Sequence, residues 1–305
     1  MYDLAIIGGG PAGVAGGVYA ARKKMKTVLI TDFFGGQSLV SADIQNWIGV
    51  VSISGFEWGK KLEEHLRAQE SIDIMDSDLV SKVERMDGGW RLLTQSGKAI
   101  EAKTMLLTSG SRRRKLNVPG EKEFESRGVA YCSICDAPLF KDRAVVVAGG
   151  GNSGLEATID LLPYATKIFL LHRGDVLKGD PVTQEKVVRN PKVQVILNVE
   201  IQEIIGSQIV TGLKYRDKIS SDVRMLDVQG VFVEIGSVPN SDFVKEFVKL
   251  NDWGEVVVDH KTQRTSVEGI WAAGDITDVM YKQNNISMGD AVKATLNIYE
   301  YFRSR

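Results

Sequence analysis

Cysteine and histidine are scarce in this chain, and their scarcity narrows the chemistry it can perform. Two cysteines, Cys132 and Cys135, and three histidines occur among 305 residues. A zinc site usually draws three or four ligands from these residue types, so we expect no metal. A secreted disulfide scaffold would need more cysteines in a shorter chain, so we expect a reducing, cytoplasmic setting. The Gly-x-Ser-x-Gly signature of serine hydrolases is also missing.

Long hydrophobic runs and an excess of one charge are absent too. The 38 Lys and Arg residues balance 39 Asp and Glu residues, which gives a net charge of −1. This charge creates no electrostatic field that would attract nucleic acid or an anionic membrane. Runs such as Ala144–Ala148 are too short to span a bilayer. Leu4–Ile7 predicts a first strand, so we expect no signal peptide before it. The basic run Arg112–Lys115 lacks interleaved aromatics, and we interpret it as a solvated linker.

Two glycine-rich turns stand out among the features that are present. The first, Gly8–Gly13, follows an apolar run and precedes a predicted helix from Val14 to Lys23. Gly8 would make the tight turn, Gly10 would let the backbone approach a pyrophosphate, and Gly13 would allow close packing of helix on strand. The helix N-terminus would then offer its amides to the phosphates.

The second turn, Gly149–Gly154, repeats this pattern. A predicted strand at 143–148 precedes it, a predicted helix at 155–162 follows it, and another strand is predicted at 167–171. A single glycine-rich turn is weak evidence, but two turns in strand-turn-helix context predict two nucleotide sites. A chain of this length also favours two domains.

The C-terminal part indicates which nucleotide belongs to which turn. Gly269–Asp275 and Leu106–Gly110 resemble the later flavin-binding motifs of flavoproteins with two dinucleotide domains. This resemblance implies a discontinuous FAD-binding domain at 1–113 and 244–305. The segment 114–243 would then be an inserted NAD(P)H-binding domain.

The two cysteines lie just upstream of the second turn, as Cys132-Ser133-Ile134-Cys135-Asp136. This spacing lets an intrachain disulfide close at a helix start, and it can lower one thiol pKa. Together with Gly35-Gly36-Gln37, Asn46 and Tyr281-Lys282-Gln283, these motifs make the chain resemble the low-molecular-weight thioredoxin reductase family along nearly its whole length. The chain also resembles the flavoprotein subunit of alkyl hydroperoxide reductase, in its C-terminal two-thirds.

The resemblance implies an α/β fold with two Rossmann-like, three-layer dinucleotide-binding domains, of the pyridine nucleotide disulfide oxidoreductase class II type. It implies a homodimer in which electrons pass from NAD(P)H to FAD, to the disulfide and then to a partner protein. Cys135 would face the flavin as the charge-transfer thiolate, and Cys132 would attack the partner's disulfide. Asp136 would move protons to and from the thiols, although a carboxylate bound by local amides at a helix start would look the same in the sequence.

The motifs supply two sets of candidate cofactor contacts. Those expected for FAD are Gly8, Gly10, Pro11, Ala12, Gly13, Asp32, Gly36, Gln37, Asn46, Gly110, Gly274, Asp275, Lys282 and Gln283. Those expected for NAD(P)H are Gly149, Gly151, Asn152, Ser153, Gly154, Glu156, His172, Arg173, Lys178 and Gly236.

The nucleotide preference depends on the residues after the strand at 167–171. NADPH-specific members of the family carry His-Arg-Arg there and another Arg a turn later, whereas this chain has His172-Arg173-Gly174 and Lys178. Lysine offers a point charge in place of the bidentate arginine fork, so fewer donors are available here to bind the 2′-phosphate of NADPH. No acid occupies the strand end, where an NADH enzyme usually has one. The sequence therefore favours NADPH, with NADH possible.

The partner and the electron path leave several alternatives open. Ala137–Phe140 differs from the common thioredoxin reductases and resembles the hydroperoxide-reductase branch, while Arg127 retains a position implicated in docking. That branch has an N-terminal thioredoxin-like module, so we expect an external thioredoxin- or glutaredoxin-like protein here. The alternatives are a ferredoxin- or deazaflavin-dependent thioredoxin reductase, a peroxide-forming NAD(P)H oxidase and a redox-sensing regulatory flavoprotein.

Overall fold

The computed structural model describes residues 1–41 and 44–304, which divide into two compact units. The first unit comprises Met1–Leu39, Trp47–Arg112 and Val238–Arg305, and the second comprises Val40–Asn46 and Arg113–Ser237. The chain thus returns to the first unit at Val238, ahead of the boundary at 244 expected from the sequence. The assignment of one cofactor to each unit stays a prediction.

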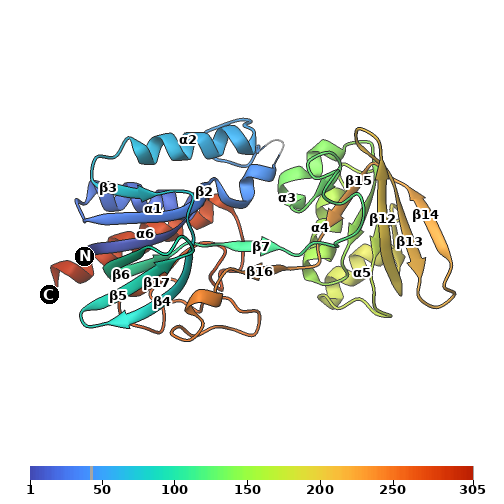
Figure 1. The fold of residues 1–305 in the computed structure, drawn as a ribbon. Helices are drawn as coiled ribbons and strands as arrows, with labels where there is room; N and C mark the ends of the chain where they lie inside the picture. Colours follow the sequence, from blue (N-terminus) through green and yellow to red (C-terminus); the bar gives the residue numbers. More distant parts are fainter. Residues whose placement is uncertain (42–43, 305) are drawn as a thin grey trace. The chain divides into compact units, whose positions relative to one another are not determined.

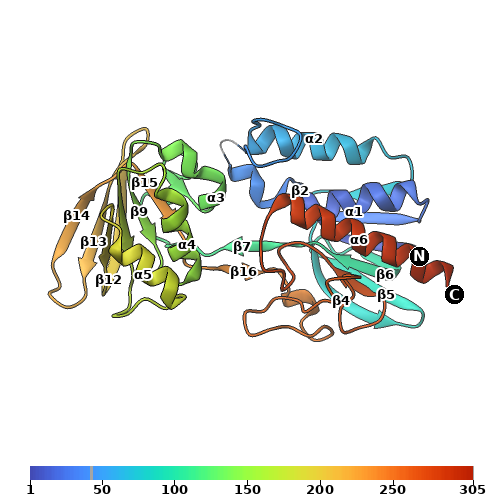
Figure 2. The same ribbon diagram turned by 180° about the vertical axis from the view of Figure 1, so that it is seen from behind.

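The first unit is built on a sheet of order β3-β2-β1-β6-β5-β4, with β17 also paired to β6 (Figure 1). Its elements in chain order are β1 (Tyr2–Gly9), α1 (Pro11–Arg22), β2 (Thr27–Phe34), the 3-10 helix η1 (Gly36–Val40), α2 (Gly55–Arg67), β3 (Ile72–Met75), β4 (Val80–Met86), β5 (Gly89–Thr94), β6 (Ala99–Leu107), η3 (Asp242–Val244), β17 (Ile270–Ala272) and α6 (Asn284–Arg303). Helices α1 and α6 lie side by side in both ribbon views (Figures 1 and 2).

Strand β6 takes part in both antiparallel and parallel pairing within this sheet. Its first half, Ala99–Ala102, pairs antiparallel with β5, whereas Met105–Leu107 pairs parallel with β17. Its partner on the other edge is β1, in parallel register. Met105 and Leu107 are fully buried, so this junction lies in the core and fixes where β1 ends.

The second unit has three layers. Its elements are β8 (Val129–Ala130), α3 (Ser133–Asp136), η2 (Ala137–Phe140), β9 (Ala144–Ala148), α4 (Asn152–Leu161), β10 (Lys167–Leu171), α5 (Pro181–Arg189), β11 (Val193–Ile196), β12 (Val199–Gly206), β13 (Val210–Asp217), β14 (Val223–Asp227) and β15 (Gly230–Val233). A parallel sheet of order β11-β10-β9-β15-β8 lies between the helices and an antiparallel sheet of order β12-β13-β14.

The side chains of β9 show how the central sheet separates the layers. Val145 and Val147 pack in a cluster with Leu155 of α4, whereas Val146 packs in a cluster with Leu213 of β13. Successive strand residues point to opposite faces, so an unbroken apolar strand buries both faces at once. The predicted class, two Rossmann-like domains of α/β type, is confirmed.

Two short strands join the units. β7 (Ser111–Arg113) and β16 (Ser237–Pro239) form a separate two-stranded sheet. On one side of this pair Asn240 donates its amide to the carbonyl of Gly110 at 2.9 Å, and on the other Arg114 donates to Gly236 at 2.9 Å. The outgoing and returning chain therefore run next to each other.

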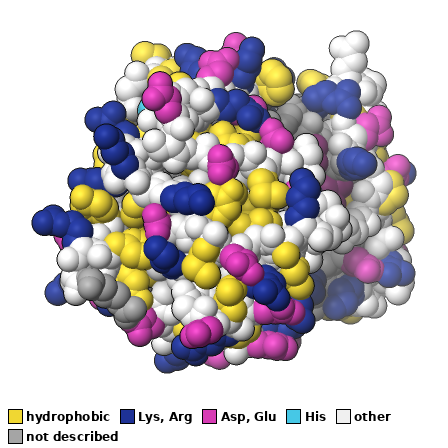
Figure 3. Space-filling model, turned by 60° about the vertical axis from the view of Figure 1, so that its left-hand side comes forward, with side chains coloured by type: hydrophobic (Ala, Val, Ile, Leu, Met, Phe, Trp, Pro, Cys, Tyr) yellow, Lys and Arg dark blue, Asp and Glu magenta, His cyan; other side chains and the backbone are white. Residues whose placement is uncertain are grey.

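The surface mixes charges of both signs. On the face in Figure 3, lysine and arginine side chains lie among acidic ones, and hydrophobic side chains lie singly or in small groups. Within residues 1–41 and 44–304, no helix combines the length and apolar character that crossing a bilayer requires.

Candidate functional site

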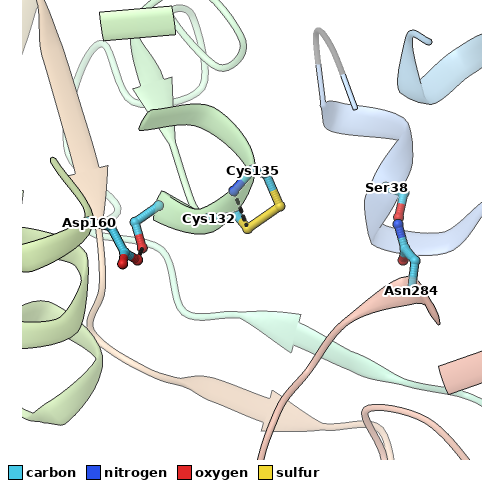
Figure 4. Close-up of a disulfide and its surroundings, with 6 residues drawn as sticks. Ser38, Cys132, Cys135, Asp160 and Asn284 are labelled. Atoms are coloured by element: carbon cyan, nitrogen blue, oxygen red, sulfur yellow. Dashed lines mark hydrogen bonds between the residues drawn. A yellow bond between two sulfur atoms is a disulfide. The ribbon is translucent and has the colours of Figure 1, made fainter. Parts of the chain in front are cut away.

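Cys132 and Cys135 form a disulfide at the start of α3 (Figure 4). Cys132 is the N-cap residue of this short helix, and its Sγ accepts a hydrogen bond from the backbone N–H of Cys135 at 3.2 Å. Both cysteines are half-buried. When the pair is reduced, this amide contact would favour negative charge on the Cys132 sulfur. Asp136 ends α3, is half-buried, and donates its amide to the carbonyl of Cys132 at 3.0 Å.

Two carboxylates bind Ser133, the first of the two residues between the cysteines. Ser133 donates its hydroxyl to Oδ2 of Asp160 on α4 at 2.8 Å. Its backbone N–H donates to Glu234, which follows β15 and is 8% exposed. The pKa of Glu234 is raised to about 7, chiefly by burial; Arg113 and the Ser133 N–H oppose the increase, and Asp160 and Glu156 add to it. Asp160 and Glu234 are not among the site residues predicted from the sequence, although Glu234 is an acid at the end of an apolar run just before Gly236.

The second glycine turn connects β9 to α4, and its glycines serve different purposes: backbone conformation, helix packing and open space for a ligand. Gly149 has a φ of +134°, and a Cβ on Gly154 would lie 1.9 Å from the carbonyl oxygen of Gly149. A Cβ on Gly151 would meet nothing within 4 Å. The space beside Gly151 is therefore open to a ligand, while Gly154 is required for packing. Gly236, with a φ of +97°, also has a left-handed conformation.

The remaining polar candidates of this turn lie at the start of α4. Ser153 and Glu156 project from its first two turns, and Oδ1 of Asn152 accepts the backbone N–H of Asp180 at 2.7 Å. That bond ties the turn to the start of α5. No side chain caps the N-terminus of α4, so its first amides are available to a phosphate group.

His172 packs over the same turn. Its Nδ1 accepts the N–H of Gly150 at 3.1 Å, so the neutral ring carries its proton on Nε2. Burial lowers the pKa of His172, and the positive charges of Lys178 and Arg173 lower it further. A Cβ on Gly174 would lie 2.9 Å from Nε2 of His172, so a larger residue at this position would require the imidazole ring to shift.

A cavity of about 590 Å³ lies within the first unit, at the carboxyl ends of β1 and β2. The first glycine turn forms one wall: Gly8 has a φ of +115°, and a Cβ on Gly13 would lie 1.8 Å from the carbonyl oxygen of Gly8. The sequence-predicted FAD contacts that line the cavity are Gly8, Gly10, Pro11, Ala12, Asp32, Gly36, Gln37, Gly110, Gly274 and Asp275. A glycine turn opening a helix beside an exposed acid on β2 fits an adenine dinucleotide.

Four of the residues predicted to contact FAD are not part of the cavity lining. Gly13 packs beneath the turn, and Asn46 groups with the second unit. Lys282 forms an ion pair with Glu255 at 2.9 Å, and Gln283 is the N-cap residue of α6.

The sequence analysis also missed several polar residues in the lining. Ser38 donates its hydroxyl to Oδ1 of Asn284 at 3.0 Å (Figure 4), and Arg112 donates to Oδ1 of Asn240 at 2.9 Å. Asn284 is the first residue of α6, and it follows directly after the motif Tyr281-Lys282-Gln283. Within the described residues, no group of three His, Cys, Asp or Glu side chains could hold a metal ion.

Comparisons with known proteins agree with this arrangement. The family model of the pyridine nucleotide-disulphide oxidoreductases matches residues 2–293. An NADH dehydrogenase of Bacillus subtilis is 41% identical over 98% of this chain and 58% of its own length. One component of the alkyl hydroperoxide reductase of Xanthomonas campestris pv. phaseoli is 41% identical over 98% of this chain and 57% of its own length. This chain therefore spans less than two-thirds of each relative.

Solved structures give the same answer for the fold. The thioredoxin reductase of Streptococcus pyogenes has a TM-score of 0.93 and 34% identity, and the match covers 100% of this chain and 99% of that one. The resemblance predicted from the motifs is confirmed, and a flavin and a nicotinamide cofactor follow from the family. The chain belongs to the pyridine nucleotide-disulphide oxidoreductase family.

Proposed function

We propose that this oxidoreductase passes electrons from NAD(P)H, with NADPH preferred, through FAD and the Cys132–Cys135 pair to a thioredoxin- or glutaredoxin-like protein. One observation carries the proposal: the disulfide opens α3 in the same unit as the β9–α4 glycine turn. The similarity to a solved thioredoxin reductase supports this choice of acceptor. A homodimer in the reducing cytoplasm belongs to the same proposal.

Different parts of the chain would bind the two cofactors. The cavity around Gly10 and Asp275 would hold FAD, which when bound supplies the means to take a hydride's two electrons and deliver them to a disulfide. The β9–α4 turn would hold the pyrophosphate of the nucleotide.

Transfer to the partner is a thiol–disulfide exchange. The Cys132 thiolate bonds to one sulfur of the partner's disulfide, whose S–S bond breaks and whose other sulfur leaves as a thiolate. Cys135 then bonds to Cys132 Sγ, which re-forms the internal disulfide and releases the partner as a dithiol. Asp136, beside the pair, would take the proton from the Cys132 thiol before the attack and return a proton to the thiolate that leaves the partner.

Partner-dependent turnover tests the proposal. The purified protein with FAD, NADPH or NADH and a thioredoxin should reduce the thioredoxin disulfide, and Cys132→Ser should abolish this activity. Cys132→Ser should also leave Cys135 as a thiolate with a long-wavelength absorbance band against the flavin. A thioredoxin that stays oxidised with both nucleotides would refute the acceptor, and a band only in Cys135→Ser would reverse the two cysteine roles.

The relative named NADH dehydrogenase favours a second candidate, in which electrons go to an acceptor other than a dithiol protein. In that case a double variant, Cys132→Ser with Cys135→Ser, should retain its nucleotide oxidation. Under the first proposal the same variant should keep flavin reduction but lose turnover with thioredoxin.

A further inference from the structure

A second cavity, of about 360 Å³, lies in the second unit and has a strongly cationic lining. The residues around it are Arg173, Glu200, Arg216, Lys218 and Ser221. Three cations face one carboxylate, and that carboxylate is engaged in an ion pair with Arg216. A cavity of this composition suits a small, doubly charged anion.

Backbone hydrogen bonds explain why residues so far apart in sequence meet here. Asn198, in the turn between β11 and β12, donates its amide to the carbonyl of Gly174 at 2.9 Å. The carbonyl of the same residue accepts the amide of Lys218, just past the end of β13, at 2.7 Å. Nζ of Lys218 then donates to the carbonyl of Arg173 at 3.2 Å. The end of β13 is thereby held against the segment that follows β10.

The location of the cavity identifies the anion. Arg173 follows β10, the second strand after the β9–α4 turn, and in dinucleotide folds this strand end faces the substituent on the adenosine ribose. Gly174 follows Arg173 at the position where NADPH-specific members of the family carry a second arginine, so one cation of the expected clamp is missing here. Arg216 and Lys218, at the end of β13, supply positive charge beside Arg173 in the lining of the cavity.

We propose that Arg216 and Lys218 act with Arg173 to bind the 2′-phosphate of NADPH. This inference rests on the proposed use of a nicotinamide nucleotide. Arg216 and Arg173 provide planar guanidinium donors, Lys218 provides a point charge, and the hydroxyl of Ser221 provides a further donor. Glu200 fixes the orientation of Arg216 through their cross-strand ion pair.

Calorimetric titration with two adenosine nucleotides tests the site without reference to activity. The probes are 2′,5′-ADP and 5′-AMP, which differ by the 2′-phosphate alone. The flavin-loaded protein is compared with Arg216→Gln, Lys218→Gln and the control Lys214→Gln. Lys214 also lies on β13 and forms a cross-strand ion pair, with Glu203 at 2.7 Å, but it does not line the cavity.

The wild-type protein should bind 2′,5′-ADP at least about tenfold more tightly than 5′-AMP, as expected for a charge-assisted phosphate contact. Arg216→Gln and Lys218→Gln should each reduce that ratio at least about threefold, while Lys214→Gln leaves it unchanged. The inference is overturned if the two variants match Lys214→Gln, or if the wild-type ratio is near one. Flavin reduction by NADH in that second case would leave the proposed function standing. A flavin that neither NADPH nor NADH reduces would instead count against the proposed function.

Discussion

At the scale of single residues, Glu234 links the environment of the disulfide to pH. Its carboxyl is buried and bonded to the backbone of Ser133, and its pKa is raised from 4.5 to about 7. Between these values the folded protein keeps a proton that the unfolded chain has released. The contribution to stability is therefore complete below about pH 4.5 and is lost as pH rises through about 7.

This pKa shift predicts a pH-dependent free energy of unfolding. Between about pH 5 and pH 7 the wild-type protein should lose up to about 1.4 kcal/mol per pH unit from this group. Glu234→Gln, which cannot ionise, should show a flatter profile over the same range. Urea unfolding at several pH values measures both slopes, and identical slopes for the two proteins would contradict the assignment.

Gln263 offers a second prediction at this scale. Its side chain is fully buried, and neither atom of its amide group finds a hydrogen-bond partner among the described residues. A buried polar group without a partner costs about 1–3 kcal/mol. Gln263→Met keeps the length of the side chain and removes the polar atoms, so it should raise the free energy of unfolding by about 1 kcal/mol. A loss of stability in chemical denaturation would show that the amide has a partner such as water.

At the scale of elements, the turn between β9 and α4 contains one glycine needed for packing, Gly154, and one that leaves space for a ligand, Gly151. Gly154→Ala places a Cβ 1.9 Å from a backbone oxygen, whereas Gly151→Ala places one in open space. We expect Gly154→Ala to destabilise the second unit by about 2–4 kcal/mol and Gly151→Ala to change stability by less than about 0.5 kcal/mol.

Nucleotide affinity should be reduced in Gly151→Ala, the variant whose stability is unchanged. In Gly151→Ala the added methyl group occupies the space that a pyrophosphate would enter, so nucleotide affinity should fall although the fold is intact. Thermal unfolding and titration with 2′,5′-ADP provide the two measurements. Full affinity in Gly151→Ala would mean that the phosphates do not approach this turn.

The elements that the sequence predicted well are those determined by local chemistry. Gly8 and Gly149 require positive φ, and the apolar runs on either side have the periods of buried strands and helices. Pro11 begins α1 earlier than the predicted start at Val14, because a proline suits the first helical position and the glycine-rich segment continues the helix.

The residues that the sequence did not predict depend on long-range contacts. Glu234 contacts Ser133 because β15 ends beside α3, and Lys218 lines the second cavity because Asn198 bonds both to it and to Gly174. Neither has a motif of its own. Lys282 shows the opposite case, since it belongs to a motif and yet its ammonium group is engaged by Glu255.

At the scale of the whole molecule, two separate cores predict two separate responses to ligands. A ligand stabilises the state that binds it, by about 2.7 kcal/mol at a hundred times its Kd. FAD should therefore slow hydrogen exchange in β1, α1 and α6, and 2′,5′-ADP should slow it in β9 and α4. Hydrogen-exchange mass spectrometry with each ligand alone measures this, and protection of both units by either ligand would contradict it.

The pairing of β7 with β16 means that the segment inserted between them could be removed from the chain. Gly110 and Asn240 are joined by a backbone hydrogen bond, so everything between them leaves and returns at one point. Removing a segment whose ends touch leaves a gap that a very short loop can close at little entropic cost. Residues 113–237 form most of the second unit, so a short loop from Arg112 to Val238 would remove them and keep the residues that line the cavity of the first unit.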